Sequence, residues 1–197
     1  MDNTLYETIN RNVSRYVRFT DEELGIFNSL LKLQSVHKKT ILLHEGEKCN
    51  FEAFVIKGCL RKYYIDPDGT ELIIQFGVED SWIGDISFSI YDPKPSRVFI
   101  ETIEDSELFT MSPDDKEELY RRVPKFERVF RILMQRNLAV TQDRLFASIS
   151  KSASQKYLEF LEQYPSLPQR VPQHYIASYL GISPEFLSKV RKKLAHR

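Results

Sequence analysis

The chain has 197 residues, of which 42% are hydrophobic and 28% are charged, with 28 basic and 28 acidic side chains. This composition is typical of a soluble globular protein and excludes a disordered or fibrous one. No run of eighteen apolar residues is present, which excludes a membrane span. The polar start lacks the features of a signal peptide, and Cys49 and Cys59 cannot form a disulfide framework, so we expect a cytoplasmic protein with reduced thiols.

The neutral total hides an uneven distribution of charge. Residues 66–118 contain fifteen acidic and three basic side chains, whereas residues 168–197 contain six basic side chains and one acidic. A phosphate backbone responds to the local field of a protein, so the basic C-terminal end is compatible with nucleic acid.

Helices followed by strands are predicted for the first part of the chain. Thr20 and Glu23 have the spacing of a capping box, and apolar residues follow them at three- and four-residue intervals. From about Lys38 to Met111 the period changes to two, with candidate strands at 40–44, 51–57, 60–65, 71–76, 98–103 and 107–111. Many short strands with regular turns predict an antiparallel barrel or double-sheet roll.

A long helix is predicted from about Pro124 to Ser148. Its apolar residues approximate a heptad stripe: Phe126, Phe130, Leu133, Leu138, Thr141 and Leu145. A helix of about 25 residues is about 37 Å long, more than a small domain buries alone. We therefore expect this stripe to form the interface of a homodimer; the alternative is that it packs on the chain's own roll.

The last thirty residues predict a helix-turn-helix. A helix from about Pro172 to Leu180 carries the small residue Ala177, and Gly181 is suited to the left-handed turn that ends it. Ser183 is a natural N-cap, and Pro184 is tolerated at the first position of the next helix. Phe186 or Leu187, with Val190 and Leu194, would face inward.

The outward residues of this last helix suit the major groove of duplex DNA. We expect Glu185 to accept a hydrogen bond from the amino group of cytosine and Lys189 to donate one to guanine. Ser188 suits either a base or a phosphate. Basic residues toward the helix end would meet phosphates: Arg191, Lys192 and Lys193. The DNA-binding set, with the N-cap, is therefore Ser183, Glu185, Ser188, Lys189, Arg191, Lys192 and Lys193.

Two other classes of protein are weighed against a DNA-binding regulator. A metalloenzyme of the cupin type needs several histidines, but the roll contains only His44, with His37 just before it, and no catalytic motif is present. We therefore expect neither an enzyme nor a metal site. A sensory or signalling module whose C-terminal part binds protein rather than DNA stays as the alternative.

The order of these elements resembles the CRP/FNR family of bacterial transcription regulators over nearly the whole chain. The most specific stretches are 175–185, YIASYLGISPE, and 83–88, IGDISF. The resemblance implies an α+β fold: an effector-sensing β-roll of the double-stranded β-helix (jelly-roll) type with N-terminal helices at 1–122, a dimerisation helix at 123–149, and a helix-turn-helix domain at 150–197. Since the chain stops at Arg197, we expect no terminal wing.

The resemblance also implies an effector site in the roll and a mechanism. The family's phosphate-binding cassette maps onto Gly84, Asp85, Ile86, Ser96 and Arg97, and the dimer-helix position that touches the purine in nucleotide-responsive members maps near Asn137. The arginine–serine pair is inverted here, and alternation along a strand would point Arg97 away from the pocket unless the loop 91–95 shifts by one residue. We expect an effector other than cyclic AMP, which repositions the helix-turn-helix on a palindromic operator, with RNA polymerase as a further partner.

Overall fold

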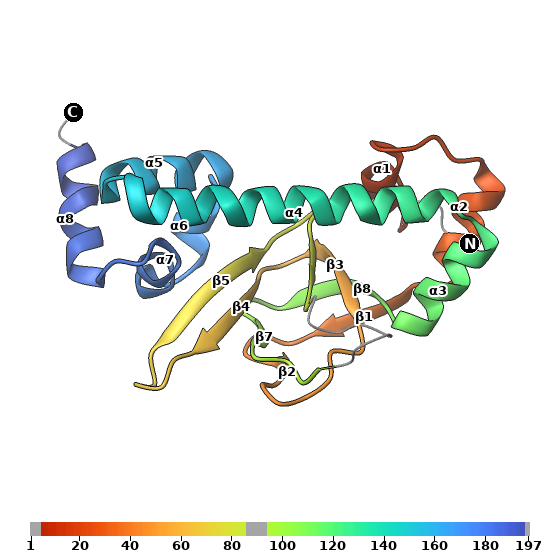
Figure 1. Cartoon of the computed structure of the whole chain (residues 1–197), viewed down its shortest axis with the longest axis horizontal. Helices are drawn as coiled ribbons and strands as arrows, with labels where there is room; N and C mark the ends of the chain where they lie inside the picture. Colours follow the sequence, from red (N-terminus) through yellow and green to blue (C-terminus); the bar gives the residue numbers. More distant parts are fainter. Residues whose placement is uncertain (1–4, 86–93, 196–197) are drawn as a thin grey trace. The chain divides into compact units, whose positions relative to one another are not determined.

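The computed structural model describes residues 5–85 and 94–195, in which two helices precede a run of strands and further helices follow it along the chain (Figure 1). The N-terminal helices are α1 (Glu7–Ser14) and α2 (Asp21–Ser29). The strands are β1 (Lys32–Val36), β2 (Ile41–Leu43), β3 (Glu52–Lys57), β4 (Leu60–Ile65), β5 (Glu71–Gly77), β6 (Trp82–Gly84), β7 (Phe99–Thr102) and β8 (Ser106–Met111). The later helices are α3 (Pro113–Arg122), α4 (Lys125–Ser150), α5 (Ala153–Gln163), α6 (Leu167–Arg170), α7 (Gln173–Leu180) and α8 (Pro184–Ala195).

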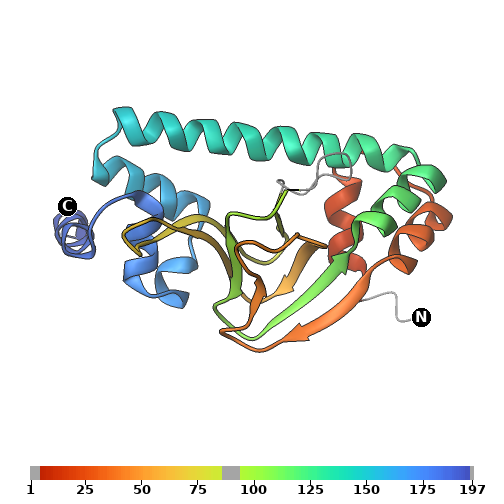
Figure 2. The same cartoon turned by 60° about the horizontal axis from the view of Figure 1, so that its bottom comes forward.

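The strands form two four-stranded sheets with the orders β1-β8-β3-β6 and β2-β7-β4-β5 (Figure 2). The pairs β1–β8, β3–β8, β3–β6, β2–β7 and β4–β7 are antiparallel. Except for β4 and β5, which are consecutive in the chain, neighbours in each sheet are far apart in the sequence, as in a jelly roll. The predicted α+β fold with an antiparallel β-roll is therefore confirmed.

Strands β1 and β6 were not predicted from the sequence. The six predicted strands correspond to β2, β3, β4, β5, β7 and β8. Strand β1 lies at a sheet edge and its first four residues are exposed, so it has no apolar alternation. Strand β6 has three residues, fewer than a period-two pattern needs to be recognised.

Contacts within the chain divide it into two compact units. The first unit comprises Met1–Tyr63 and Phe76–Gln135, and the second comprises Tyr64–Gln75 and Arg136–Arg197. The division falls inside α4, which is one continuous helix of 26 residues. Among the residues that the structure describes, no helix is long and apolar enough to cross a membrane.

Aromatic side chains build the core of the first unit. Phe27, Phe54, Phe109 and Phe126 are at most 1% exposed and bring α2, α4 and the sheet of β3 and β8 together. Phe126 lies between two rings, at centroid distances of 4.4 Å from Phe19 and 4.6 Å from Phe27. The first turns of α4 are thus part of this core.

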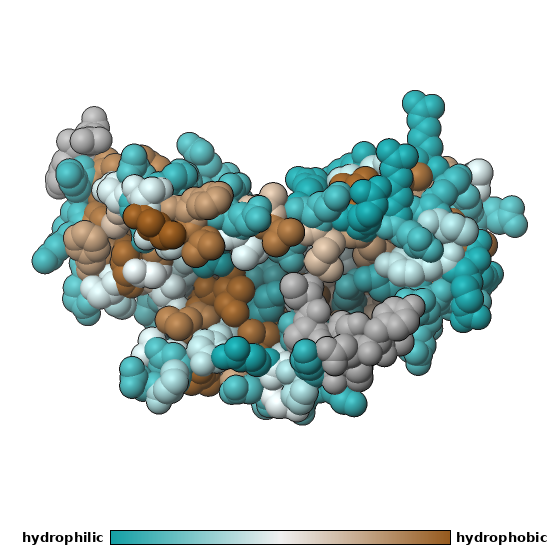
Figure 3. Space-filling model, in the orientation of Figure 1, coloured by the Kyte–Doolittle hydropathy of each residue, from teal (hydrophilic) through white to brown (hydrophobic). Residues whose placement is uncertain are grey.

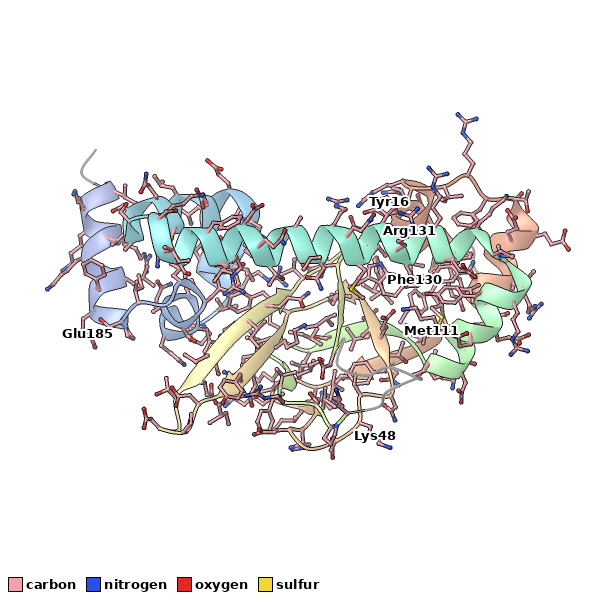
Figure 4. All side chains as sticks on the ribbon, in the orientation of Figure 1. Tyr16, Lys48, Met111, Phe130, Arg131 and Glu185 are labelled. Atoms are coloured by element: carbon pink, nitrogen blue, oxygen red, sulfur yellow. The ribbon has the colours of Figure 1, made fainter. Side chains whose placement is uncertain are left out.

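The position of the apolar stripe on α4 requires a correction. Phe126 is fully buried and Phe130 is 8% exposed, and Leu133 packs against the same cluster. Figure 4 shows Phe130 pointing to one side of α4 and Arg131 to the other. Phe126 and Phe130 therefore cannot face a partner, because the N-terminal helices and the roll already cover them, whereas Leu133 is only partly buried and its place at an interface stays a prediction.

The second half of α4 carries the part of the stripe that remains exposed. Leu138 and Leu145 are each 58% exposed, and Thr141 between them is exposed as well. Met134 and Ile149 extend the same row at three- and four-residue spacings. Figure 3 shows hydrophobic side chains gathered on the surface over this half of the helix.

Candidate DNA-binding surface and effector pocket

Helices α7 and α8 form the predicted helix-turn-helix. Gly181 ends α7 with a φ of 66°, and the N–H groups of Gly181 and Ile182 donate to the carbonyls of Ser178 (3.1 Å) and Ala177 (3.0 Å). This is the hydrogen-bond pattern of a helix that ends in a left-handed residue. Ala177 is fully buried in the unit that contains both helices.

Helix α8 begins as its sequence predicts. The Ser183 hydroxyl accepts from the N–H of Phe186 at 3.2 Å, and Pro184 is the first helical residue. Leu187 is 1% exposed and Val190 is 5% exposed, so these two side chains pack α8 on its unit. Of the two inward candidates, Leu187 is the correct one, because Phe186 is half exposed.

The seven predicted DNA-binding residues lie on the exposed side of this motif. Their side chains are all classed as exposed: Ser183, Glu185, Ser188, Lys189, Arg191, Lys192 and Lys193. Glu185 lies at the N-terminal end of α8 (Figure 4). Its pKa is lowered, first by its own backbone N–H and then by the Ser183 hydroxyl, so the carboxylate is an ionised acceptor near neutral pH.

Strand β5 holds α7 through side chains that the sequence analysis missed. The Ser178 hydroxyl donates to the Glu71 carbonyl at 2.7 Å and accepts from the Ile73 N–H at 2.9 Å. The Arg144 guanidinium donates to the carbonyls of Tyr179 (3.0 Å) and Ile73 (3.3 Å). No sequence signal distinguishes Ser178 or Arg144 from ordinary helix residues; the contacts emerge only once the β5 backbone is placed.

The predicted effector residues fall on different parts of the fold. Gly84 ends β6, and Asp85 follows it, whereas Ile86 lies outside the described residues. Ser96 is 2% exposed and its hydroxyl donates to the Val98 carbonyl at 3.1 Å, while Arg97 is exposed. In the inverted pair, Ser96 is therefore the buried residue and Arg97 is the exposed one. Asn137 is exposed on α4.

A lysine that the sequence analysis did not single out reaches Gly84. Lys62 on β4 is 8% exposed, and its ammonium group donates to the Gly84 carbonyl at 3.0 Å. Burial lowers the pKa of Lys62, and the negative charge of Asp85 opposes this shift. A buried amine thus lies beside the Gly84–Asp85 segment.

The neighbouring Arg61 is also buried, but it is fully paired. Its guanidinium contacts the Glu101 carboxylate at 2.6 and 2.8 Å, and Arg61 and Glu101 face each other across β4 and β7. Such a double contact is a strong form of charge pairing. We assign Arg61 to holding these two strands together.

The thiols and the metal-binding residue types form no reactive centre in the described part of the chain. Cys49 and Cys59 are buried thiols, and burial raises the pKa of the Cys49 thiol, so it stays protonated near neutral pH. Within residues 5–85 and 94–195, no group of three His, Cys, Asp or Glu side chains is placed to hold a metal ion.

Comparisons with known proteins agree with this geometry. Residues 33–123 match the family model of the cyclic nucleotide-binding domain. The cAMP-activated global transcriptional regulator CRP of Escherichia coli is 20% identical over 185 residues, covering 89% of this chain and 88% of CRP. The structure is similar to FixK2 of Bradyrhizobium japonicum (TM-score 0.75, 20% identity, 84% and 85% coverage) and to the c-di-GMP-responsive regulator CLP of Xanthomonas campestris (TM-score 0.70, 17% identity, 90% and 92% coverage).

Proposed function

We propose that this chain, whose residues 33–123 match the cyclic nucleotide-binding domain, is a dimeric, DNA-binding transcription regulator of the CRP/FNR type. The observation that carries the proposal is helix α8. It is capped at Ser183 after a left-handed glycine, packs through Leu187 and Val190, and presents Glu185 and Lys189 outward. A helix with this exposed face fits the major groove.

The roles of the outward residues follow from their places along α8. Glu185 and Lys189 are in the first two turns, where side chains of a recognition helix contact base edges. Lys192 and Lys193 are in the last turn and suit phosphates, which add affinity without sequence information. The exposed row of Leu138, Thr141 and Leu145 on α4 supports a second copy of the chain as the dimer partner.

We propose an effector other than cyclic AMP for the roll. Arg97 is exposed and the Ser96 hydroxyl is bonded to Val98, so neither is available inside for a cyclic phosphate. The ammonium group of Lys62 lies at Gly84 with Asp85 nearby, which leaves little net positive charge for an anion.

A thermal-shift screen with cyclic AMP and a metabolite panel tests this proposal about the effector, since a ligand at 100 times its Kd adds about 2.7 kcal/mol of stability. A shift with cyclic AMP alone would contradict the proposal.

The function itself is tested by selecting duplexes from a random pool with the full-length protein at low salt. We expect enrichment of a palindromic consensus with half-sites about one helical turn apart, as a symmetric dimer requires. The competing function is a signalling module whose C-terminal part binds protein. Absence of binding to any duplex at low salt would favour that module over the regulator, because basic helices bind DNA most tightly there.

A further inference from the structure

Phe186 on α8 is an exposed aromatic side chain in a helix whose other outward residues include Glu185, Lys189 and Lys193. It is 50% exposed, although its neighbour Leu187 is 1% exposed and Val190 is 5% exposed. These two residues already pack α8, so the phenyl ring of Phe186 is not needed to hold the helix. Its backbone N–H is fixed by the Ser183 hydroxyl at 3.2 Å, which sets the place of the ring near the start of the helix.

The ring lies beside the residues proposed to contact DNA. With 3.6 residues per turn, Phe186 is about 60° around the helix from Lys189 and about 20° from Lys193. Both lysines are exposed. A helix that places Lys189 in the major groove therefore brings Phe186 to the wall or floor of the same groove.

The major groove offers one apolar group that suits this ring. Thymine carries a C5-methyl group there, whereas the other three bases present polar edges or a bare ring carbon. A phenyl ring that is half exposed in free protein loses contact with water when it packs on a methyl group, which is favourable. Neither Glu185 nor Lys189 can make this contact, since both bring charges to the groove.

We propose that Phe186 makes the protein read thymine at a fixed position of each half-site, through the C5-methyl group. This inference rests on the proposed function, because it requires α8 in the major groove. It assigns a specificity role to a residue that contributes no hydrogen bond to a base and no charge to a phosphate. Uracil is the matched probe, because it differs from thymine only by that methyl group.

The experiment uses a duplex selected by the full-length protein. Each thymine that the selection fixes is replaced in turn by uracil, and dissociation constants are measured for the wild-type protein and Phe186→Ala. At one position of the half-site we expect uracil to weaken wild-type binding about fourfold, and about 15-fold when both half-sites are changed. Phe186→Ala should bind the thymine and uracil duplexes equally, and Phe186→Leu should keep part of the preference.

A control separates this contact from a general loss of surface hydrophobicity. Leu158 on α5 is 44% exposed in the same unit, and Leu158→Ala should keep the full preference for thymine. The inference is overturned, and the proposed function kept, if wild-type protein binds its site but tolerates uracil everywhere, or if Phe186→Ala still discriminates. If wild-type protein binds no duplex at all, both the proposed function and this inference fall.

Discussion

Lys62 is a buried, titratable residue of the roll. Its ammonium group is buried at the Gly84 carbonyl, and burial lowers its pKa below that of an exposed lysine. The unfolded chain therefore binds more protons than the folded one in the window between the lowered pKa and the ordinary value of about 10.4. The contribution of Lys62 to the free energy of unfolding therefore rises with pH through that window. Below the window, the cost of burying its charged form is at its full value.

This gives a prediction for Lys62→Met, which keeps an unbranched side chain one atom shorter and removes the charge. We expect the free energy of unfolding of the wild-type protein to increase relative to that of Lys62→Met between about pH 7 and pH 10. Urea unfolding of both proteins at each pH measures the difference and removes the effects of other titrating groups. A difference that is constant with pH would mean that folding does not lower the pKa of Lys62.

Gly58 and Gly46 allow the cost of backbone strain to be separated from the cost of steric overlap with neighbouring atoms. Both have positive φ, 100° and 86°, but a Cβ on Gly58 would lie 2.3 Å from the Ser106 hydroxyl, whereas a Cβ on Gly46 would meet nothing within 4 Å. We expect Gly46→Ala to cost about 1 kcal/mol from backbone strain alone. Gly58→Ala should cost about 3 kcal/mol, because the β8 backbone must also move. Equal losses in urea unfolding would contradict the close packing at Gly58.

Single residues also show what the sequence can and cannot predict. Alternation along a strand predicts that an inverted Ser96–Arg97 pair turns the arginine outward, and Arg97 is exposed. Lys62 could not be predicted in the same way. A lysine in a strand normally indicates an exposed position, and only the packed roll shows that this one reaches Gly84.

Among the elements, those defined by local chemistry were predicted best. The cap at Ser183, the left-handed Gly181 and the capping box at Thr20 each depend on a few neighbouring residues, and all three are present. The stripe on α4 was predicted as a single interface. Periodicity identifies the apolar face of a helix, but it does not say what covers that face, and the N-terminal half proved to be core.

The exposed half of α4 leads to a prediction about the dimer. Leu138→Glu places a charge in the middle of the exposed row and should convert the dimer to a monomer in sedimentation. Val140→Glu is the control: Val140 is 42% exposed on the same helix but lies about 160° away from Leu138. Leu133→Glu is unsuitable, since Leu133 packs on the core and its loss would damage the fold. Unchanged mass for Leu138→Glu would place the interface elsewhere.

At the scale of the whole molecule, the zero net charge is the sum of a positive unit and a negative unit. The second unit, which contains α7 and α8, has ten basic and seven acidic residues; the first has the remaining eighteen basic and twenty-one acidic residues. The basic surplus is thus in the unit proposed to meet DNA. Because Arg191, Lys192 and Lys193 lie within three successive positions of α8, this surplus is concentrated at one helix end.

The salt dependence of binding tests this distribution in the dimer. If these three residues contact phosphates in both protomers, six contacts give a slope of log K against log salt of about −5. Lys192→Ala removes two of them, so the slope should become less steep by about 2, with equal loss on the selected site and on random duplex. Lys189→Ala should instead weaken the selected site more than random DNA and leave the slope nearly unchanged. The same slope change and the same loss for both variants would mean that Lys189 contacts the backbone and that sequence is read by other residues of α8.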